Sequence, residues 1–194
     1  MIRRRVVPCL LWRGRGLYKS LRFGRPTYLG DPINIVRIFN DKAVDELILL
    51  DIDASRNGYS PRFDDVEEIV SEAFVPLCYG GGIRSLDDVK RLMRLGVEKV
   101  ALNTSAIENL DMVRKVSDLV GRSSTVVSID VKRNIFGKLQ VYSHSGRRPN
   151  IRDPIAYARA AQEAGAGEIL VQSVDRDGTM RGYDLLLIEG IAKA

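Results

Sequence analysis

The hydrophobic residues of this chain fall into short, nearly continuous runs that are separated by longer amphipathic stretches. Aliphatic runs without polar alternation are typical of parallel strands that are buried on both faces of a sheet. The pattern therefore predicts six strands, at residues 5–10, 46–50, 75–79, 99–102, 125–129 and 168–171. Leu11 and Trp12 would then follow the first strand at its carboxyl end.

The amphipathic stretches carry the start and stop signals of helices. Asp31 followed by Pro32 opens one helix, and Ser85, with acidic residues in the next turn, opens another that stops at Gly96. The same signals frame the stretches 109–121 and 153–165. One segment breaks the pattern, because residues 134–144 predict a short hairpin after the fifth strand.

Six alternations of strand and helix predict a parallel α/β fold, for which an open doubly wound sheet and a barrel both fit. A weak internal repeat favours a (β/α)₈ TIM barrel of two halves, because residues 44–53 resemble 166–175 and residues 4–13 resemble 124–133. In that alignment Leu10 takes the position of Asp130, and Leu11 is the next residue along the chain.

The number of strand–helix units is too small for a closed barrel, which needs eight. Only about six βα units are present, so we expect a single TIM-barrel domain, residues 1–194, that is incomplete at its C-terminus. Strands seven and eight are expected beyond residue 194.

The composition of the chain limits which kinds of ligand and which surroundings we expect for the protein. The chain is 45% hydrophobic and 28% charged, as in ordinary globular proteins, and it has no apolar run of membrane-spanning length and no export signal. We therefore expect a cytoplasmic protein without membrane contact.

The net charge of +5 is not arranged as a basic stripe with aromatic residues, which argues against nucleic acid and leaves an anionic small molecule as ligand. His144 is the only histidine, so a multi-histidine metal site is excluded, and we expect neither metal nor cofactor.

Polar and glycine residues gather where the predicted strands end. In a barrel all these ends meet on one rim, where active sites lie. The residues are Asp51, Asp53, Gly80, Gly81, Gly82, Asn103, Thr104, Ser105, Asp130, Asp175, Asp177, Gly178 and Thr179.

Each of these groups has a chemical and a plainer interpretation. The glycine triplet lets backbone N–H groups approach a phosphate, with donors from Asn103 and Thr104, but it would also serve as a tight turn. The DRDGT segment is either a second anion loop or a type I turn. Asp130 is either a general acid or base, or a solvated carboxylate that pairs with Lys132.

Six motifs give the chain a family resemblance: VPCL, LLDIDAS, GGGIRSLDDV, KVALNT, VVSIDVKR and GAGEILVQSVDRDGTMRGYD. Together they resemble the cyclase subunit of imidazole glycerol phosphate synthase, a lyase of histidine biosynthesis that is coupled to a glutamine amidotransferase. The resemblance implies a (β/α)₈ barrel with two phosphate sites on its catalytic face. It also implies a glutaminase subunit on the opposite face, with ammonia passing through the barrel.

The resemblance assigns roles to particular residues. An ammonia gate would comprise Arg5, Glu46, Lys99 and Glu168, although two cations and two anions could equally form a salt-bridged plug at the barrel floor. The glutaminase partner would dock near Asp45 and Glu98. Substrate and phosphate binding would fall to Lys19, Asp51, Gly81, Gly82, Asn103, Thr104, Asp177, Gly178 and Thr179.

One catalytic position departs from the family pattern. The family has an aspartate where Leu11 stands and uses it with the equivalent of Asp130 as an acid/base pair. Leucine cannot transfer a proton, and the loss of one general acid or base typically costs about 10²–10⁴-fold in rate. The loop that follows Leu11 is altered too, although Lys19 is retained.

Three functions remain open. The first is a paralogue that channels ammonia from a glutaminase to an amidation reaction, of the kind that the resemblance associates with lipopolysaccharide sugar synthesis. The second is a working histidine-pathway cyclase in which Asp51 or Asp53 replaces the missing acid. The third is a non-catalytic scaffold that activates a glutaminase.

Overall fold

The computed structural model describes residues 4–150 and 152–194, and their packing defines two compact units. The first unit contains the N-terminal residues up to Lys19 together with Thr27–Ala101. The second contains Ser20–Pro26 and Leu102–Ala194.

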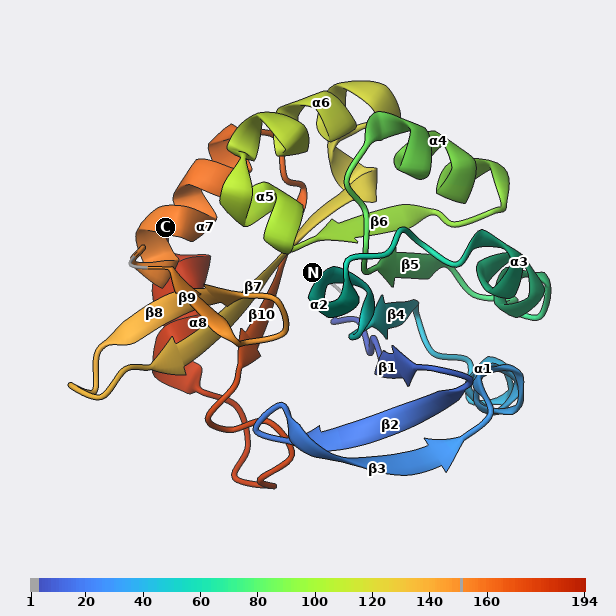
Figure 1. The fold of residues 1–194 in the computed structure, drawn as a ribbon, viewed down its shortest axis with the longest axis horizontal. Coiled ribbons are helices and arrows are strands. Elements are labelled where there is room, and N and C mark those ends of the chain that lie inside the picture. Colours follow the sequence, from blue (N-terminus) through green and yellow to red (C-terminus); the bar gives the residue numbers. More distant parts are fainter. Residues whose placement is uncertain (1–3, 151) are drawn as a thin grey trace. The chain divides into compact units, whose positions relative to one another are not determined.

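A parallel sheet forms the centre of the first unit (Figure 1). It contains β1 (Cys9–Arg13), β4 (Leu47–Asp51), β5 (Leu77–Gly80) and β6 (Lys99–Leu102), paired in that order. The side chains on both faces of β4 and β5 are nearly all buried, which explains why the sequence shows unbroken apolar runs there.

Three helices cover one side of this sheet (Figure 1). They are α1 (Pro32–Asp41), α3 (Phe63–Ser71) and α4 (Leu86–Arg94), and each buries a valine completely: Val36, Val66 and Val89. A fourth, α2 (Ala54–Asn57), is a single turn after β4.

The helix starts predicted from the sequence are confirmed. The Asp31 carboxylate accepts a hydrogen bond from Asn34 N at 3.1 Å. Ser85 and Asp88 form a reciprocal capping box, in which Ser85 Oγ accepts from Asp88 N at 3.1 Å and Asp88 Oδ2 accepts from Ser85 N at 3.0 Å. Each cap satisfies backbone donors that would otherwise have no partner at the helix start.

The first strand begins later than predicted. Residues 5–8 precede β1. Pro8 has no N–H to donate, although its carbonyl accepts from Ile48 N at 2.9 Å, and Val6 N donates to Asp45 Oδ2 at 2.7 Å. The strand also ends later than predicted, at Arg13, so Leu11 and Trp12 are inside β1 rather than beyond its end.

The sequence did not predict the next two strands, β2 (Gly16–Leu21) and β3 (Gly24–Gly30). Strand β2 runs antiparallel to β1, with Tyr18 opposite Leu11. Most of β3 is exposed, so it lacks the apolar alternation by which strands are recognised.

The second unit is built on the parallel pair β7 (Thr125–Arg133) and β10 (Glu168–Ser173). The hairpin predicted at residues 134–144 is confirmed as β8 (Leu139–Ser143), which pairs antiparallel with β7; β9 (Arg148–Asn150) then pairs with β8. Strand β7 therefore continues past its predicted end, and Asp130 lies within it, opposite Tyr142.

Helices complete the second unit: α5 (Thr104–Glu108), α6 (Leu110–Val120), the 3₁₀ turn η1 (Arg122–Ser124), α7 (Pro154–Glu163) and α8 (Leu185–Ala192). Within the described ranges, six parallel strands alternate with helices as the sequence predicted, with β2 and β3 inserted after β1 and with β8 and β9 inserted after β7. No helix in the described part of the chain is both long and apolar enough to cross a bilayer.

Candidate functional site

Asp51, the last residue of β4, is surrounded by hydrogen-bond donors. Its side chain has no solvent exposure. It accepts hydrogen bonds from the backbone N–H of Asp53 and of Ala54, each at 3.1 Å, from Tyr59 Oη at 3.0 Å, and from Arg62 Nε at 3.2 Å. Burial, followed by the negative charge of Asp51, raises the pKa of Tyr59 to about 12. Asp51 therefore anchors the segment that follows β4.

Arg62 connects three parts of the first unit. Besides Asp51, it donates from Nη1 to Gly14 O at 2.5 Å and to Asp65 at 3.1 Å, and its guanidinium carbon lies 3.5 Å from the ring centroid of Trp12. Trp12 is 2% exposed, so this stack is part of the packed interior. The sequence did not single out Arg62, because a lone arginine before a helix carries no recognisable signal.

No acid stands at position 11. Leu11 is half-buried in β1 between Tyr18 of β2 and Leu50 of β4. Asp53, the other acid considered as a replacement, forms ion pairs with Arg13 at 3.0 Å and with Arg56 at 3.7 Å.

The glycines after β5 are required by packing. Gly81 and Gly82 have φ of +123° and +71°. A Cβ on Gly81 would lie 2.5 Å from Asp51 O, and one on Gly82 would lie 2.5 Å from Tyr59 O. The tight-turn interpretation accounts for both residues, so their phosphate role stays a prediction. Lys19, another predicted phosphate ligand, is exposed on β2.

Three of the four predicted gate residues form one ion-pair cluster. Glu46 is buried just before β4, and its Oε2 lies 3.1 Å from Arg5 Nη1 and 2.6 Å from Lys99 Nζ. The cluster lies at the amino ends of the strands, opposite the ends that carry Asp51. The fourth residue, Glu168, opens β10 in the second unit and is half-buried. Of the two predicted docking carboxylates, Glu98 is exposed, and Asp45 is half-buried and bonds the backbone of Val6.

In the second unit, Asp130 is a buried carboxyl group, 4% exposed. Burial raises its pKa to about 7 from the ordinary 3.8; the charge of Asp177 raises it further, while a hydrogen bond from Gly146 N–H opposes the shift. Such a group holds and releases a proton near neutral pH, which suits a general acid or base. The alternative of a solvated carboxylate is wrong, because Asp130 is buried.

Asp177 fastens the DRDGT loop to the tip between β2 and β3. Its Oδ2 accepts from Ser20 Oγ at 2.6 Å and from Phe23 N at 3.3 Å, and its backbone oxygen accepts from Arg22 N at 2.9 Å. Thr179 closes the loop by donating from Oγ1 to Arg176 O at 2.7 Å. The loop is thus a turn that holds a distant segment, and its anion-binding role stays a prediction.

Asn103 and Thr104 have bonding partners of their own within the second unit. Asn103 Nδ2 donates to Ser128 O at 3.0 Å, and Thr104 Oγ1 accepts from His144 N at 3.3 Å. These bonds hold the residues at the end of β6 and leave their predicted phosphate contacts untested. The described residues include no group of three or more side chains arranged to hold a metal ion.

Comparison with known proteins identifies the family. A family model described as histidine biosynthesis protein matches residues 5–194. "Putative imidazole glycerol phosphate synthase subunit hisF2" of Pseudomonas aeruginosa is 50% identical over 192 residues, which cover 99% of this chain and 76% of that protein. "Imidazole glycerol phosphate synthase subunit HisF" of Exiguobacterium sibiricum is 41% identical over 189 residues, 97% of this chain and 76% of that protein. The chain therefore belongs to the histidine biosynthesis protein family of (β/α)₈ barrels, as its resemblance to the cyclase subunit of imidazole glycerol phosphate synthase predicted.

Proposed function

We propose that this chain is a cytoplasmic cyclase-subunit homologue that pairs with a glutaminase and passes ammonia to an amidation reaction, without efficient closure of an imidazole ring. The acceptor that we propose is a sugar of surface-polysaccharide (lipopolysaccharide) synthesis. The names of the matched relatives support a subunit of a larger synthase. The acceptor pathway rests on the resemblance alone.

One observation carries the proposal: among its described residues, the first unit supplies no available acid at the ends of β1 and β4. Leu11 is aliphatic, Asp51 is fully buried among donors, and Asp53 is paired with arginines. Recruiting Asp51 as a proton donor would break its bonds to Tyr59 and Arg62. Using Asp51 in place of the missing aspartate would therefore destabilise the segment that follows β4.

Asp130 supplies the other half of the chemistry. With a pKa of about 7 it can donate or accept a proton, but ring closure with loss of a leaving group needs both steps. Because only one carboxyl group of the family's acid/base pair is retained, we expect ring closure to be slow rather than efficient.

The ion-pair cluster of Arg5, Glu46 and Lys99 supports the glutaminase side of the proposal. A buried carboxylate held by two cations is more costly to bury than an apolar residue of the same size. Its position at the amino ends of the strands is the face on which the resemblance places the partner and the entrance for ammonia.

The test is a gain of function at position 11. The full chain, Leu11→Asp and the matched control Leu11→Asn are supplied with the phosphoribosyl substrate of the cyclase and ammonium chloride, and ring formation is measured. We expect Leu11→Asp to exceed both other proteins by about 10²-fold or more, because only it adds a second acid/base group.

Two other outcomes distinguish the remaining functions. Turnover of the unmodified chain at the rate of Leu11→Asp would overturn the proposal in favour of a working histidine-pathway cyclase. Stimulation of glutamine hydrolysis by the unmodified chain, with no transfer of ammonia to any acceptor, would leave a scaffold that only activates the glutaminase.

A further inference from the structure

The turn between β8 and β9, residues 144–147, has an unusual backbone. His144, Ser145 and Gly146 have φ of 53°, 55° and 73°, in the left-handed region that residues with a side chain seldom adopt. Hairpin connections of this length are most often built around a type I turn, whose central residues have negative φ. A strained conformation of this kind persists only where the surrounding structure imposes it.

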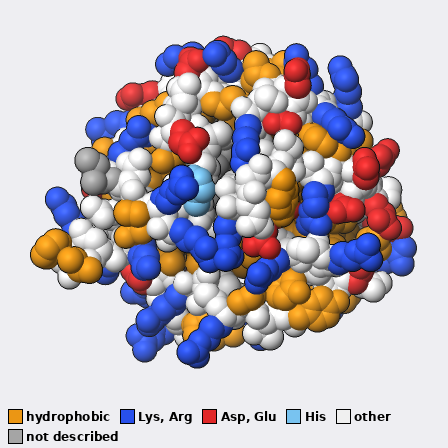
Figure 2. Space-filling model, in the orientation of Figure 1, with side chains coloured by type: hydrophobic (Ala, Val, Ile, Leu, Met, Phe, Trp, Pro, Cys, Tyr) orange, Lys and Arg blue, Asp and Glu red, His pale blue; other side chains and the backbone are white. Residues whose placement is uncertain are grey.

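Burial of the His144 ring does not account for this backbone. The side chain is half-buried, and it is visible at the surface in Figure 2, in which the single histidine of the chain has its own colour. Its Nδ1 is hydrogen-bonded with Ser143 Oγ at 3.0 Å, and Arg147 N donates to Ser143 O at 3.0 Å and closes the turn. The remaining constraints on the turn come from elements outside it.

Two side chains on other elements bond the backbone N–H groups of this turn. Thr104 Oγ1, at the start of α5, accepts a hydrogen bond from His144 N at 3.3 Å, across 40 residues of sequence. The carboxyl group of Asp130, on β7, accepts one from Gly146 N. The two donors are two residues apart in the turn, so the contact at Thr104 constrains where the Gly146 N–H lies.

The Thr104 hydroxyl group is itself held in place. It donates to Asn103 Oδ1 at 3.4 Å, and Asn103 Nδ2 donates to Ser128 O on β7 at 3.0 Å. Because the hydrogen of this hydroxyl group is directed to Asn103, a lone pair of its oxygen is available to His144 N. A chain of hydrogen bonds therefore runs from β7 through Thr104 to the turn, and it returns to β7 at Asp130.

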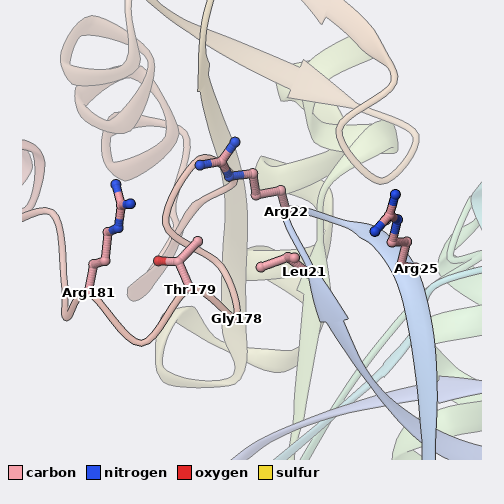
Figure 3. Close-up of a pocket in the computed structure, with 7 residues that line it drawn as sticks. Leu21, Arg22, Arg25, Gly178, Thr179 and Arg181 are labelled. Atoms are coloured by element: carbon pink, nitrogen blue, oxygen red, sulfur yellow. The ribbon is translucent and has the colours of Figure 1, made fainter.

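Packing holds the other end of the turn. A Cβ on Gly146 would lie 2.9 Å from Cδ2 of Phe23. Phe23 belongs to the β2–β3 tip, and its N–H donates to Asp177 Oδ2 at 3.3 Å. In Figure 3, Gly178, the residue after Asp177, lies beside Leu21 of this tip. The Gly146 end of the turn therefore rests on a segment that is held independently of α5.

The Gly146 bond opposes the other influences on Asp130. Burial and the charge of Asp177 favour the neutral carboxyl group, whereas the Gly146 N–H favours the charged one. The position of the turn is therefore one of the factors that set how strongly Asp130 holds its proton. The other polar groups on the paired and neighbouring segments are Tyr142 of β8, Gln172 of β10, Lys132 of β7 and His144 of the turn.

We propose that Thr104 is a positioning residue for Asp130: through its bond to His144 N it holds the 144–146 turn in the left-handed conformation that places the Gly146 N–H on the Asp130 carboxyl group. The inference rests on the proposed function only in taking Asp130 as the retained proton carrier. It gives Thr104 a task in the chain without ligand, which is separate from the phosphate contact that the resemblance predicts.

The experiment is an NMR titration of the Asp130 carboxyl carbon in the full chain without ligand. Thr104→Val keeps the shape of the side chain and removes the oxygen that accepts from His144 N. We expect it to raise the pKa of Asp130 by roughly 1, because the charged form loses a hydrogen-bond donor. Thr104→Ser restores the hydroxyl group, and in this variant Asp130 should titrate as in the unmodified chain.

Thr125→Val, at the other end of β7, is the matched control. Thr125 is fully buried, and its Oγ1 donates to Gly121 O at 2.9 Å. This substitution should lower the urea midpoint of unfolding and leave the pKa of Asp130 unchanged. General loosening of the second unit is thereby distinguished from loss of positioning.

An unchanged pKa of Asp130 in Thr104→Val would overturn the proposal, as would an equal rise in Thr104→Ser or in Thr125→Val. A second measurement follows the turn directly. Exchange of the Gly146 amide hydrogen with solvent, relative to that of Ile129 in β7, should be about tenfold faster or more in Thr104→Val, and an unchanged ratio would also refute the role of Thr104. None of these measurements uses substrate, so they can fail while the outcome of the Leu11→Asp test stands, and the reverse.

Discussion

The Asp130→Asn variant should gain stability relative to the unmodified chain as the pH rises from acid to neutral. The carboxyl group is 4% exposed, and burial raises its pKa to about 7 from 3.8. That difference corresponds to roughly 4 kcal/mol between the charged and neutral forms.

The sign follows from proton binding. Below pH 3.8 the carboxyl group is protonated in both the folded and the unfolded state and costs nothing. Between about 3.8 and 7 the folded state keeps a proton that the unfolded state has released, so the free energy of unfolding falls as pH rises. Above about 7 the full cost is present. Asparagine has no charge to bury and escapes this loss.

Urea unfolding from pH 4 to pH 8 measures the effect. The free energy of unfolding of Asp130→Asn minus that of the unmodified chain should increase with pH by up to about 4 kcal/mol. Asp118→Asn, at an exposed carboxylate on α6, is the matched control and should give a nearly constant difference. A constant difference for Asp130→Asn as well, or an NMR titration of the Asp130 carboxyl carbon near its ordinary value, would refute the reasoning.

Three further substitutions test the first unit by the same unfolding assay. Gly81→Ala should lower the free energy of unfolding by at least about 2 kcal/mol, because φ is +123° and the new Cβ would lie 2.5 Å from Asp51 O; an unchanged urea midpoint would show that the turn can move aside. Lys99→Met should cost roughly 3 kcal/mol, because it removes the nearer cation from buried Glu46, whereas Arg5→Met, at a 47% exposed side chain, should cost about 1 kcal/mol or less. Equal losses of unfolding free energy for Lys99→Met and Arg5→Met would contradict this account of the Arg5, Glu46 and Lys99 cluster.

The elements that were predicted correctly are those with local signals. Ser85 and Asp88 are three residues apart, and their capping box is readable in the chain because both partners lie in one helical turn. The β2–β3 segment was missed because its residues are mostly exposed and show no alternation of apolar and polar positions. The end of β7 was misplaced because its last residues are held by β8, a partner that a local pattern does not show.

For the candidate site residues too, the sequence shows residue type and position, whereas distant partners set their chemistry. The sequence identified Asp51 and Asp130 as polar residues near strand ends, but it did not distinguish their chemistry. Asp51 is held by Tyr59 and Arg62, and Asp130 is buried with a pKa of about 7. The sequence made both of them candidate acids, and only the tertiary structure shows that Asp51 is held by donors and that burial raises the pKa of Asp130.

The sequence by itself determined the order of the six parallel strands, the glycine turns and the leucine at position 11, because these depend on residue type and on spacing within a few positions. The tertiary structure alone decided that Asp177 holds the tip at Ser20, 157 residues earlier, and that His144 N is bonded to Thr104, 40 residues earlier. It also decided how strongly each carboxyl group holds its proton. Hydrogen bonds between distant segments and removal from water set these properties, and neither has a counterpart in the spacing of residues along the chain.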